Sequence, residues 1–324
     1  MTKTVNTVTG SISIDKLGKT FTHEHFAFGY PGYEGDTLYS DQYDEALNLG
    51  INIAGQVLAQ GISTVIDATP SDCGRKPLLL KEIAERTGLN IICATGYYYQ
   101  DGGAPSYFSR RNLFGGNRDE EVYEVFKTEL TKGIGNTGIK PGVIKLATSK
   151  DMMTEYEEIF FNAAARVAVE EKISIITHTQ EGTYGLEQAE FLISRGIEPS
   201  RIVIGHLCCN TNMDSLLSIA ETGVFLGFDR WGLQEGAGCP LDSRRIGSVL
   251  GLIGSGYAKQ IVFSQDSINF WWGRPVSLSR LNKTWNINHL ANTIIPDLKK
   301  AGVTDDILNT ILADNPKRLF SASQ

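Results

Sequence analysis

Three kinds of segment are missing from this chain of 324 residues. No run of about 18 consecutive apolar residues occurs, the length that a membrane-spanning helix needs, so we expect no membrane partner. The first residues, MTKTVNTVTGSISIDKL, hold no apolar core of signal-peptide length, from which we expect a cytoplasmic protein. No linker rich in proline, glycine or serine divides the chain. We therefore predict one domain over residues 1–324.

Cysteine and positive charge are also scarce. The five cysteines are odd in number and irregularly spaced, which suits reduced, buried thiols better than a disulfide framework. Lys and Arg number 30 against 37 Asp and Glu, so the net charge is −7. A general nucleic-acid binder needs clustered positive charge to neutralise phosphates, and we therefore predict no nucleic-acid partner.

The sequence does contain a regular alternation of strand and helix patterns. Eight short β-rich runs occur, several of them almost continuously apolar, and most are followed by a stretch with helical periodicity. The predicted strands are Lys19–His25, Ser63–Asp67, Asn90–Thr95, Gly142–Ala147, Ile173–His178, Arg201–His206, Gly223–Asp229 and Gln260–Asp266. The predicted helices are Tyr43–Gln60, Pro77–Thr87, Asp119–Lys132, Glu155–Glu171, Tyr184–Arg195, Asp214–Thr222 and Asp242–Ser255. This α/β pattern predicts a (β/α)8 TIM barrel, with a doubly wound sheet as the alternative.

The C-terminal part departs from this alternation. A long loop rich in tryptophan, residues 267–286, should follow the eighth strand. A helical pattern then covers Ile287–Ala301, in which Pro296 is expected to break the helix. A terminal helix is predicted over Asp305–Asp314.

Residues able to bind a metal gather at the C-terminal ends of five predicted strands, where barrel enzymes build their active sites. They are His23, His25, Lys145, His178, His206 and Asp266. His23 and His25 lie two residues apart and therefore point to the same side of a strand. A hydrogen-bonded core histidine is the alternative for any one of them. Four of the chain's five histidines in such positions, together with an aspartate, instead favour a metal site.

Lys145 needs its own account, because an ammonium group beside a divalent cation would be repelled. One interpretation pairs Lys145 with Asp266 or with Glu24. Another makes it a carbamate, formed when the amine takes up CO2, which would be an anionic ligand able to bridge two metals. The residues alone leave both interpretations open.

Motifs along almost the whole chain carry a family resemblance. They are THEH at Thr22–His25, IDATPSDCGR at Ile66–Arg75, ATG at Ala94–Gly96, GVIKLAT at Gly142–Thr148, THT at Thr177–Thr179, IGH at Ile204–His206, GFDRWGL at Gly227–Leu233, SQD at Ser264–Asp266 and NPKRLF at Asn315–Phe320. THEH alone is a weak motif, but the ordered set is specific. The chain resembles the phosphotriesterase family of the amidohydrolase superfamily, and within it the phosphotriesterase-like lactonases.

This resemblance implies a binuclear metal-dependent hydrolase. His23, His25 and Asp266 would bind the more buried of two divalent metals, and His178 and His206 the more exposed one. Lys145, N6-carboxylated, would bridge the two together with a hydroxide. Zinc is the expected metal, with Fe, Co or Mn as alternatives that suit the same ligands. The hydroxide would attack the substrate carbonyl, and Asp266 would pass a proton to the leaving alkoxide.

The resemblance also indicates the substrate class and the assembly. Arg230 followed by Trp231 is similar to the lactonases, which implies that both residues contact the substrate, and Tyr98 matches a tyrosine that the lactonases place against the ester oxygen. Packing at the barrel mouth is the alternative for Tyr98. Phe270, Trp271 and Trp272 would form an apolar cleft for an acyl chain, or a dimer contact. Family members are commonly homodimers, so we expect one here.

One departure from the family weakens the substrate assignment. Cys209 stands three residues beyond His206, where most relatives have an Asp that can pair with the residue matching Arg230. We expect a lactonase acting on N-acyl-homoserine or other γ- and δ-lactones, with possible promiscuous phosphotriesterase activity. An organophosphate triesterase (aryldialkylphosphatase) is the enzymatic alternative. A non-catalytic barrel that only binds a ligand is the alternative from another class.

Overall fold

Eight parallel strands form one sheet in chain order in the computed structural model, which describes residues 3–39, 41–276 and 283–321. The strands are β3 (Thr20–Glu24), β4 (Thr64–Asp67), β5 (Asn90–Gly96), β6 (Val143–Thr148), β7 (Ser174–Thr179), β8 (Ile202–Ile204), β9 (Phe225–Phe228) and β10 (Ile261–Phe263). Each strand pairs in parallel with its neighbour in sequence. This order is the one that a chain of βα units produces.

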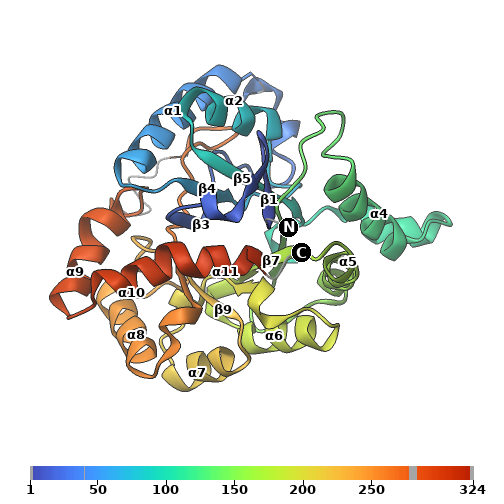
Figure 1. The fold of residues 1–324 in the computed structure, drawn as a ribbon. Helices are drawn as coiled ribbons and strands as arrows, with labels where there is room; N and C mark the ends of the chain where they lie inside the picture. Colours follow the sequence, from blue (N-terminus) through green and yellow to red (C-terminus); the bar gives the residue numbers. More distant parts are fainter. Residues whose placement is uncertain (1–2, 40, 277–282, 322–324) are drawn as a thin grey trace.

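The sheet closes on itself between β3 and β10. The Asp266 N–H donates to the His23 carbonyl at 3.0 Å, and the His25 N–H donates to the Ser267 carbonyl at 3.0 Å. The Ser264 hydroxyl accepts from the His23 N–H at 2.9 Å. Seen down its axis, the barrel is ringed by helices (Figure 1). The predicted (β/α)8 barrel is therefore confirmed.

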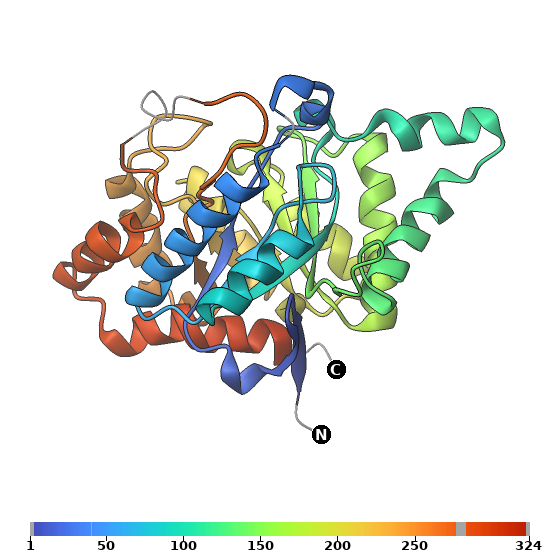
Figure 2. The same ribbon diagram turned by 90° about the horizontal axis from the view of Figure 1, so that it is seen from above.

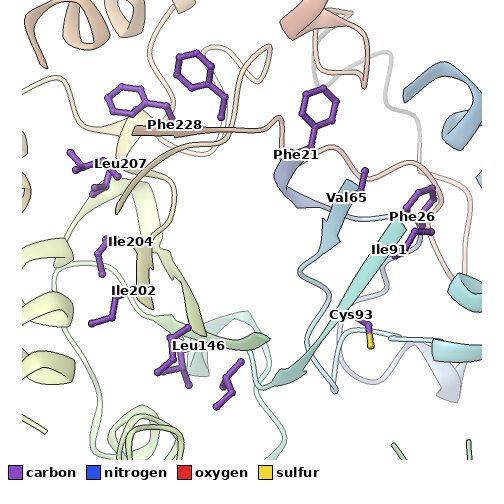
Figure 3. Packing of buried hydrophobic residues seen from close by; sticks show 14 of the residues in the cluster. Phe21, Phe26, Val65, Ile91, Cys93, Leu146, Ile202, Ile204, Leu207 and Phe228 are labelled. Atoms are coloured by element: carbon purple, nitrogen blue, oxygen red, sulfur yellow. The ribbon is translucent and has the colours of Figure 1, made fainter. Parts of the chain in front are cut away.

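Helices cover the outside of the barrel. They are α1 (Tyr43–Ala59), α2 (Pro77–Thr87), α3 (Ser106–Arg111), α4 (Arg118–Thr131), α5 (Glu155–Glu171), α6 (Gly185–Ser194), α7 (Met213–Glu221), α8 (Asp242–Gly254), α9 (Ile295–Lys300), α10 (Asp305–Asn309) and α11 (Asn315–Ser321). Apolar side chains on the outer face and on the inner face of the barrel strands form two separate clusters. Val65, Ile91 and Ile204 face the helices (Figure 3), whereas Ile176 and Val262 fill the barrel interior. Within the described ranges no helix is both long and apolar enough to cross a membrane.

Two prolines near the C-terminus do not interrupt helical structure. The expected break at Pro296 is wrong, because a π-helical turn over Leu290–Ile294 leads directly into α9. A second π-helical turn, Thr310–Asp314, joins α10 to α11, so helix continues past the predicted end at Asp314 to Ser321. A proline ring clashes with the carbonyl four residues earlier, and the wider π turn makes room for it. Of the predicted loop 267–286, residues 277–282 lie outside the described residues.

A hairpin that the sequence pattern did not predict closes the other end of the barrel. Its strands are β1 (Thr4–Thr7) and β2 (Gly10–Ser13). Val5 of this hairpin and Phe320 of α11 join the interior cluster at the N-terminal ends of the strands. Lys3 and Ser321, the first and last described residues, are hydrogen-bonded to each other on that side of the molecule (Figure 2). The opposite end, where the strands finish, is left open for the site.

Candidate metal centre

Three of the predicted ligands form a compact group at the C-terminal ends of the strands. One potential ligand atom from each of His23, His206 and Asp266 lies within 4.8 Å of the other two, and all three side chains are buried. The Asp266 carboxylate is 3.6 Å from His23 Nε2 and 3.8 Å from His206 Nε2. The fourth residue, His25, places its Nε2 3.0 Å from Asp266 Oδ1.

These separations fit ligands that share a metal ion. Two ligand atoms at about 2.1 Å from one ion in tetrahedral geometry lie about 3.4 Å apart. Three of the imidazoles, those of His23, His178 and His206, also have the protonation state that a metal ligand requires. Burial lowers the pKa of His23 to about 4 and holds those of His178 and His206 well below their ordinary value. Neutral rings keep a nitrogen lone pair free for a cation.

A carboxylate that sequence reasoning missed orients two of these rings. Asp229 follows β9, and its two oxygens accept from His23 Nδ1 at 3.0 Å and from His206 Nδ1 at 2.9 Å. With Nδ1 held in this way, Nε2 of both rings points toward Asp266. The signal was present, because Asp229 lies four residues after Phe225, an interior residue of the same predicted strand. Side-chain alternation would have placed the carboxylate inside the barrel.

Lys145 of β6 reaches the same centre. Its Nζ lies 2.8 Å from His23 Nε2 and is buried. Burial lowers the pKa of Lys145 to about 8, although the nearby carboxylates of Asp266 and Asp229 act in the opposite direction. A lower pKa increases the fraction of neutral amine, which is the form that reacts with CO2.

Glu24, one alternative partner for Lys145, is engaged elsewhere. Its carboxylate accepts from the Ser264 hydroxyl, the Ser267 hydroxyl and N–H, and the Gln265 N–H and amide group, at 2.6 to 3.1 Å. Burial raises the pKa of this carboxyl to about 7, against the lowering effect of these donors. Glu24 therefore joins β3 to the segment after β10 and leaves Lys145 to the centre.

His178 of β7 lies beside His206. Its ring lies edge-on to that of His206, with 4.5 Å between centroids. Nε2 of His178 is 2.8 Å from the Gln180 side-chain oxygen, which leaves Nδ1 as the nitrogen that could bind a metal. The Tyr99 ring stacks on His178 and the Tyr98 ring meets it edge-on.

Two of the predicted ligands sit in left-handed backbone rather than at the ends of strands. His206 has φ 62° and Asp266 has φ 51°, whereas β8 ends at Ile204 and β10 at Phe263. Such a conformation costs a non-glycine residue on the order of 1–3 kcal/mol, and it occurs chiefly at functional sites. The glycine of the IGH motif is sterically required. A Cβ on Gly205 would lie 2.2 Å from the Thr177 carbonyl oxygen.

A cavity with largely apolar walls opens above these residues. Its lining comprises His23, His25, Phe28, Tyr30, Pro70, Tyr98, Lys145, His178, His206, Arg230, Leu233, Gly236, Ala237, Asp266, Ile268, Trp271 and Trp285. All six predicted metal ligands are among them, together with Tyr98 and Arg230. The aromatic residues Phe28 and Tyr30, which come soon after THEH, were not singled out from the sequence.

Arg230 lies directly beside the centre. Its Nε donates to Asp266 Oδ2 at 2.8 Å, and Nη1 lies 4.0 Å from Cys209 Sγ, so the arginine keeps a carboxylate partner although Cys209 is a thiol. Burial alone would raise the pKa of Asp266, but its electrostatic interactions with the His206 ring and with the Arg230 guanidinium hold it well below its ordinary value. Burial raises the pKa of Tyr98, so its hydroxyl stays protonated and can donate a hydrogen bond.

The predicted aromatic substrate contacts divide into two groups. Trp271 lines the cavity. Trp231 is completely buried against Phe228 and Phe263. Phe270 packs on Trp272, and the Trp272 indole N–H donates to the Gly74 carbonyl at 3.0 Å. The structure brings none of Trp231, Phe270 and Trp272 to the cavity wall, so a substrate contact by these three remains a prediction without geometric support.

Comparison with known proteins gives a consistent picture. The model of the "Phosphotriesterase family" matches residues 3–320. The aryldialkylphosphatase of Saccharolobus solfataricus is 32% identical over 316 residues, covering 96% of this chain and 97% of that protein. The phospho-furanose lactonase of Mycoplasmopsis synoviae is 29% identical, with coverage of 98% and 92%.

Solved structures agree with this likeness. An organophosphorus hydrolase from Deinococcus radiodurans superposes with a TM-score of 0.95 at 45% identity, covering 99% of both chains. A mutant of a phosphotriesterase-like lactonase from the same organism also has a TM-score of 0.95, at 46% identity, covering 98% of this chain and 99% of that one. The barrel and its open end are therefore shared with proteins named both for lactone and for organophosphate hydrolysis.

Proposed function

We propose that this chain, which belongs to the phosphotriesterase family of metal-dependent hydrolases, opens lactone rings. The substrates would be N-acyl-homoserine lactones or other γ- and δ-lactones. The observation that carries the proposal is the contact of Arg230 with Asp266 at 2.8 Å, beside Tyr98 and under apolar cavity walls. A relative named as a lactonase supports the same reaction.

The proposed cofactor is a pair of divalent metal ions, with zinc the first choice. His23, His25 and Asp266 would hold one ion, His178 and His206 the other, and Lys145 as N6-carboxylysine would contact both. The close grouping of His23, His206 and Asp266 supports a metal centre at this place. The 3.6 and 3.0 Å separations of His23 Nε2 and His25 Nε2 from Asp266 Oδ1 support a single ion shared by those three residues. When bound, such ions lower the pKa of water and polarise a carbonyl oxygen.

Asp266 would move the proton. The carboxylate is ionised, so an oxygen is available to accept the proton of the attacking water, and its low pKa favours release of that proton to the leaving ring oxygen. Arg230, held on Asp266 Oδ2, would position this carboxylate and the substrate oxygen. Because the ring oxygen stays attached to the acyl product, the result is one hydroxy acid.

Tyr98 and the aromatic wall would bind the substrate. The protonated hydroxyl of Tyr98 can donate to the ester oxygen. Phe28, Tyr30 and Trp271 pack against one another with ring centroids 5.4 to 5.8 Å apart, and they offer an apolar surface to an acyl chain. Such a surface also excludes water from the reacting carbonyl.

The test is a kinetic comparison of the metal-loaded protein on two substrate classes. We expect kcat/KM for at least one lactone, in a series varied in ring size and acyl length, to exceed that for paraoxon. A second candidate, organophosphate triesterase, is favoured by the names of two relatives, and it would be adopted if paraoxon were hydrolysed quickly while no lactone opened. Protein that stays free of metal after growth with zinc, cobalt and manganese would favour a non-catalytic binding barrel.

We also propose that the protein is a homodimer. Three large apolar side chains, Tyr107, Leu113 and Phe114, are exposed on α3 and the turn that follows it. Exposed apolar groups close together in this way are typical of contact surfaces. Sedimentation of the protein and of a Phe114→Ser variant would test the assembly, with a monomeric wild type contradicting it.

A further inference from the structure

Two cysteines from different loops meet behind Arg230. Cys209 ends a short 3-10 turn, Leu207–Cys209, that follows His206. Cys239 lies in the loop between β9 and α8. Their sulfur atoms are 2.7 Å apart, and both side chains are buried. A disulfide has an S–S separation of about 2.05 Å, so roughly 0.7 Å of movement would bring the two sulfurs to bonding distance.

The loop that carries Cys239 is held in place from both sides. The Glu235 N–H donates to the Cys239 carbonyl at 2.8 Å, and the Cys239 N–H donates to the Gly236 carbonyl at 2.9 Å. Arg245 of α8 donates from Nε to the Pro240 carbonyl at 2.9 Å and also bonds the Arg230 carbonyl. These hydrogen bonds therefore hold the Cys239 thiol in position opposite Cys209.

A groove reaches one member of this pair. Cys209 lines a polar groove together with Glu181, Thr183, Asn210, Asn212 and Ser215. The hydrogen bond with Cys209 and the positive charges of Arg230 and Arg245 lower the pKa of Cys239, against the effect of burial. A thiol with a lowered pKa is the more reactive partner of a pair.

We propose that Cys209 and Cys239 form a reversible disulfide, a modification site at which a peroxide is the oxidant. The Cys239 thiolate attacks one oxygen of hydrogen peroxide, the O–O bond breaks, and the products are a sulfenic acid on Cys239 and hydroxide. The Cys209 sulfur then attacks Cys239 Sγ, the S–O bond breaks, and hydroxide leaves. The two thiol protons convert the two hydroxides to water, so two thiols and one peroxide give one disulfide and two waters.

The cross-link would act on the site through the loop. It ties the turn after His206 to the segment that supplies Leu233, Gly236 and Ala237 to the cavity wall. It also replaces the thiol near Arg230 by a sulfur that has no proton and cannot ionise. A cavity wall that is cross-linked in this way can move less to accommodate a long acyl chain, so we expect KM for long-chain lactones to rise about fivefold. This effect rests on the proposed function, whereas the cross-link itself does not.

The experiment treats the whole metal-loaded protein with hydrogen peroxide, blocks remaining thiols by alkylation, and maps peptides by mass. We expect a loss of two hydrogen atoms, a linked pair of peptides containing Cys209 and Cys239, and full reversal by dithiothreitol. Cys239→Ser and Cys209→Ser should abolish this linked pair. Cys208→Ala is the matched control, because it removes the adjacent thiol and should leave the cross-link intact.

Three results would overturn the proposal. They are a Cys208–Cys209 link in place of the expected one, direct conversion of Cys209 or Cys239 to sulfinic acid, and the absence of any link at peroxide levels that oxidise the unfolded chain. Activity separates this question from the enzyme assignment. If the linked peptides form but no lactone is opened in either redox state, the proposed function fails and the modification site stands.

Discussion

The two oxygens of Asp229 each hold one imidazole, and this division explains how residues from three strands act together. His23 arrives from β3 and His206 from beyond β8, and the carboxylate after β9 receives Nδ1 of both. The six residues proposed as metal ligands could be named from the sequence, because histidine, lysine and aspartate at strand ends are unusual enough to be noticed, and the structure brings all six to one cavity. Asp229 was not noticed because it contacts Nδ1 of the two rings and not the Nε2 atoms that face Asp266. A carboxylate after an apolar strand also has many structural uses.

Asp229→Asn should weaken metal binding by about 10- to 100-fold. An amide can accept from one ring, but its NH2 group meets the N–H of the other. The measurement is the loss of metal to a competing chelator. Asp242→Asn is the matched control, since Asp242 also holds a buried histidine, His289 at 2.7 Å, but away from the centre. Equal metal affinity in Asp229→Asn and the wild type would remove Asp229 from this role.

Asp266→Asn should fold and yet lose about 10³-fold in kcat, because the amide cannot accept the proton. The measurements are kcat on a lactone, the melting temperature and the metal content. Metal content is needed because the same carboxylate is a proposed ligand. Near-normal turnover at full metal occupancy would show that another group transfers the proton.

The segment after β10 offers a comparison between adjacent tryptophans. Trp271 lines the cavity, whereas the Trp272 indole is bonded to Gly74 and packs away from it. Trp271→Ala should raise KM for long-chain lactones by roughly tenfold, with little change in melting temperature. Trp272→Ala should lower the melting temperature by exposing a packing defect and leave KM nearly unchanged. Equal effects on KM would contradict this division of roles.

The closure of the barrel between β3 and β10 should make stability depend on pH. The pKa of Glu24 is raised by burial from its ordinary value of 4.5 to about 7, so the folded state binds this proton more tightly than the unfolded state does. The contribution of the protonated Glu24 carboxyl to the free energy of unfolding is therefore complete below pH 4.5. It amounts to roughly 3 kcal/mol and is lost as the pH rises through 7.

Glu24→Gln removes this titration, so the difference in unfolding free energy between wild type and variant should decline over the same pH range. Urea unfolding of the metal-saturated proteins at a series of pH values measures it. A difference that is constant with pH would show that the Glu24 carboxyl keeps an ordinary pKa.

At the level of elements, the sequence predicted the order of the eight barrel strands and the helices between them. Apolar runs and helical periodicity mark where an element lies. They do not mark where regular backbone stops, and the predicted strands Arg201–His206 and Gln260–Asp266 extended into the left-handed residues His206 and Asp266. The hairpin β1–β2 was missed because its strands are short and polar. The helices that continue past Pro296 and Pro316 depend on π turns, which leave no periodic signature.

For the molecule as a whole, metal binding should contribute to stability as well as to activity. The interior of the barrel is apolar at one end, but at the other it holds His23, Lys145, His178 and Asp266, all buried. Removal of the ions by a chelator should abolish lactone hydrolysis and lower the melting temperature. A ligand at 1,000 times its Kd contributes about 4 kcal/mol. Addition of zinc, cobalt or manganese should restore both, and an unchanged melting temperature would contradict a bound ion in this group.

The hairpin β1–β2 and α11 close the end of the barrel away from the cavity, and the first and last described residues, Lys3 and Ser321, lie there. An attachment at residue 3 or at residue 321 therefore points away from the entering substrate. The protein can be fixed to a bead, an electrode or a second enzyme through either end with its catalytic mouth facing the solution. Immobilisation through the loops around β8 and β10 would instead obstruct the mouth.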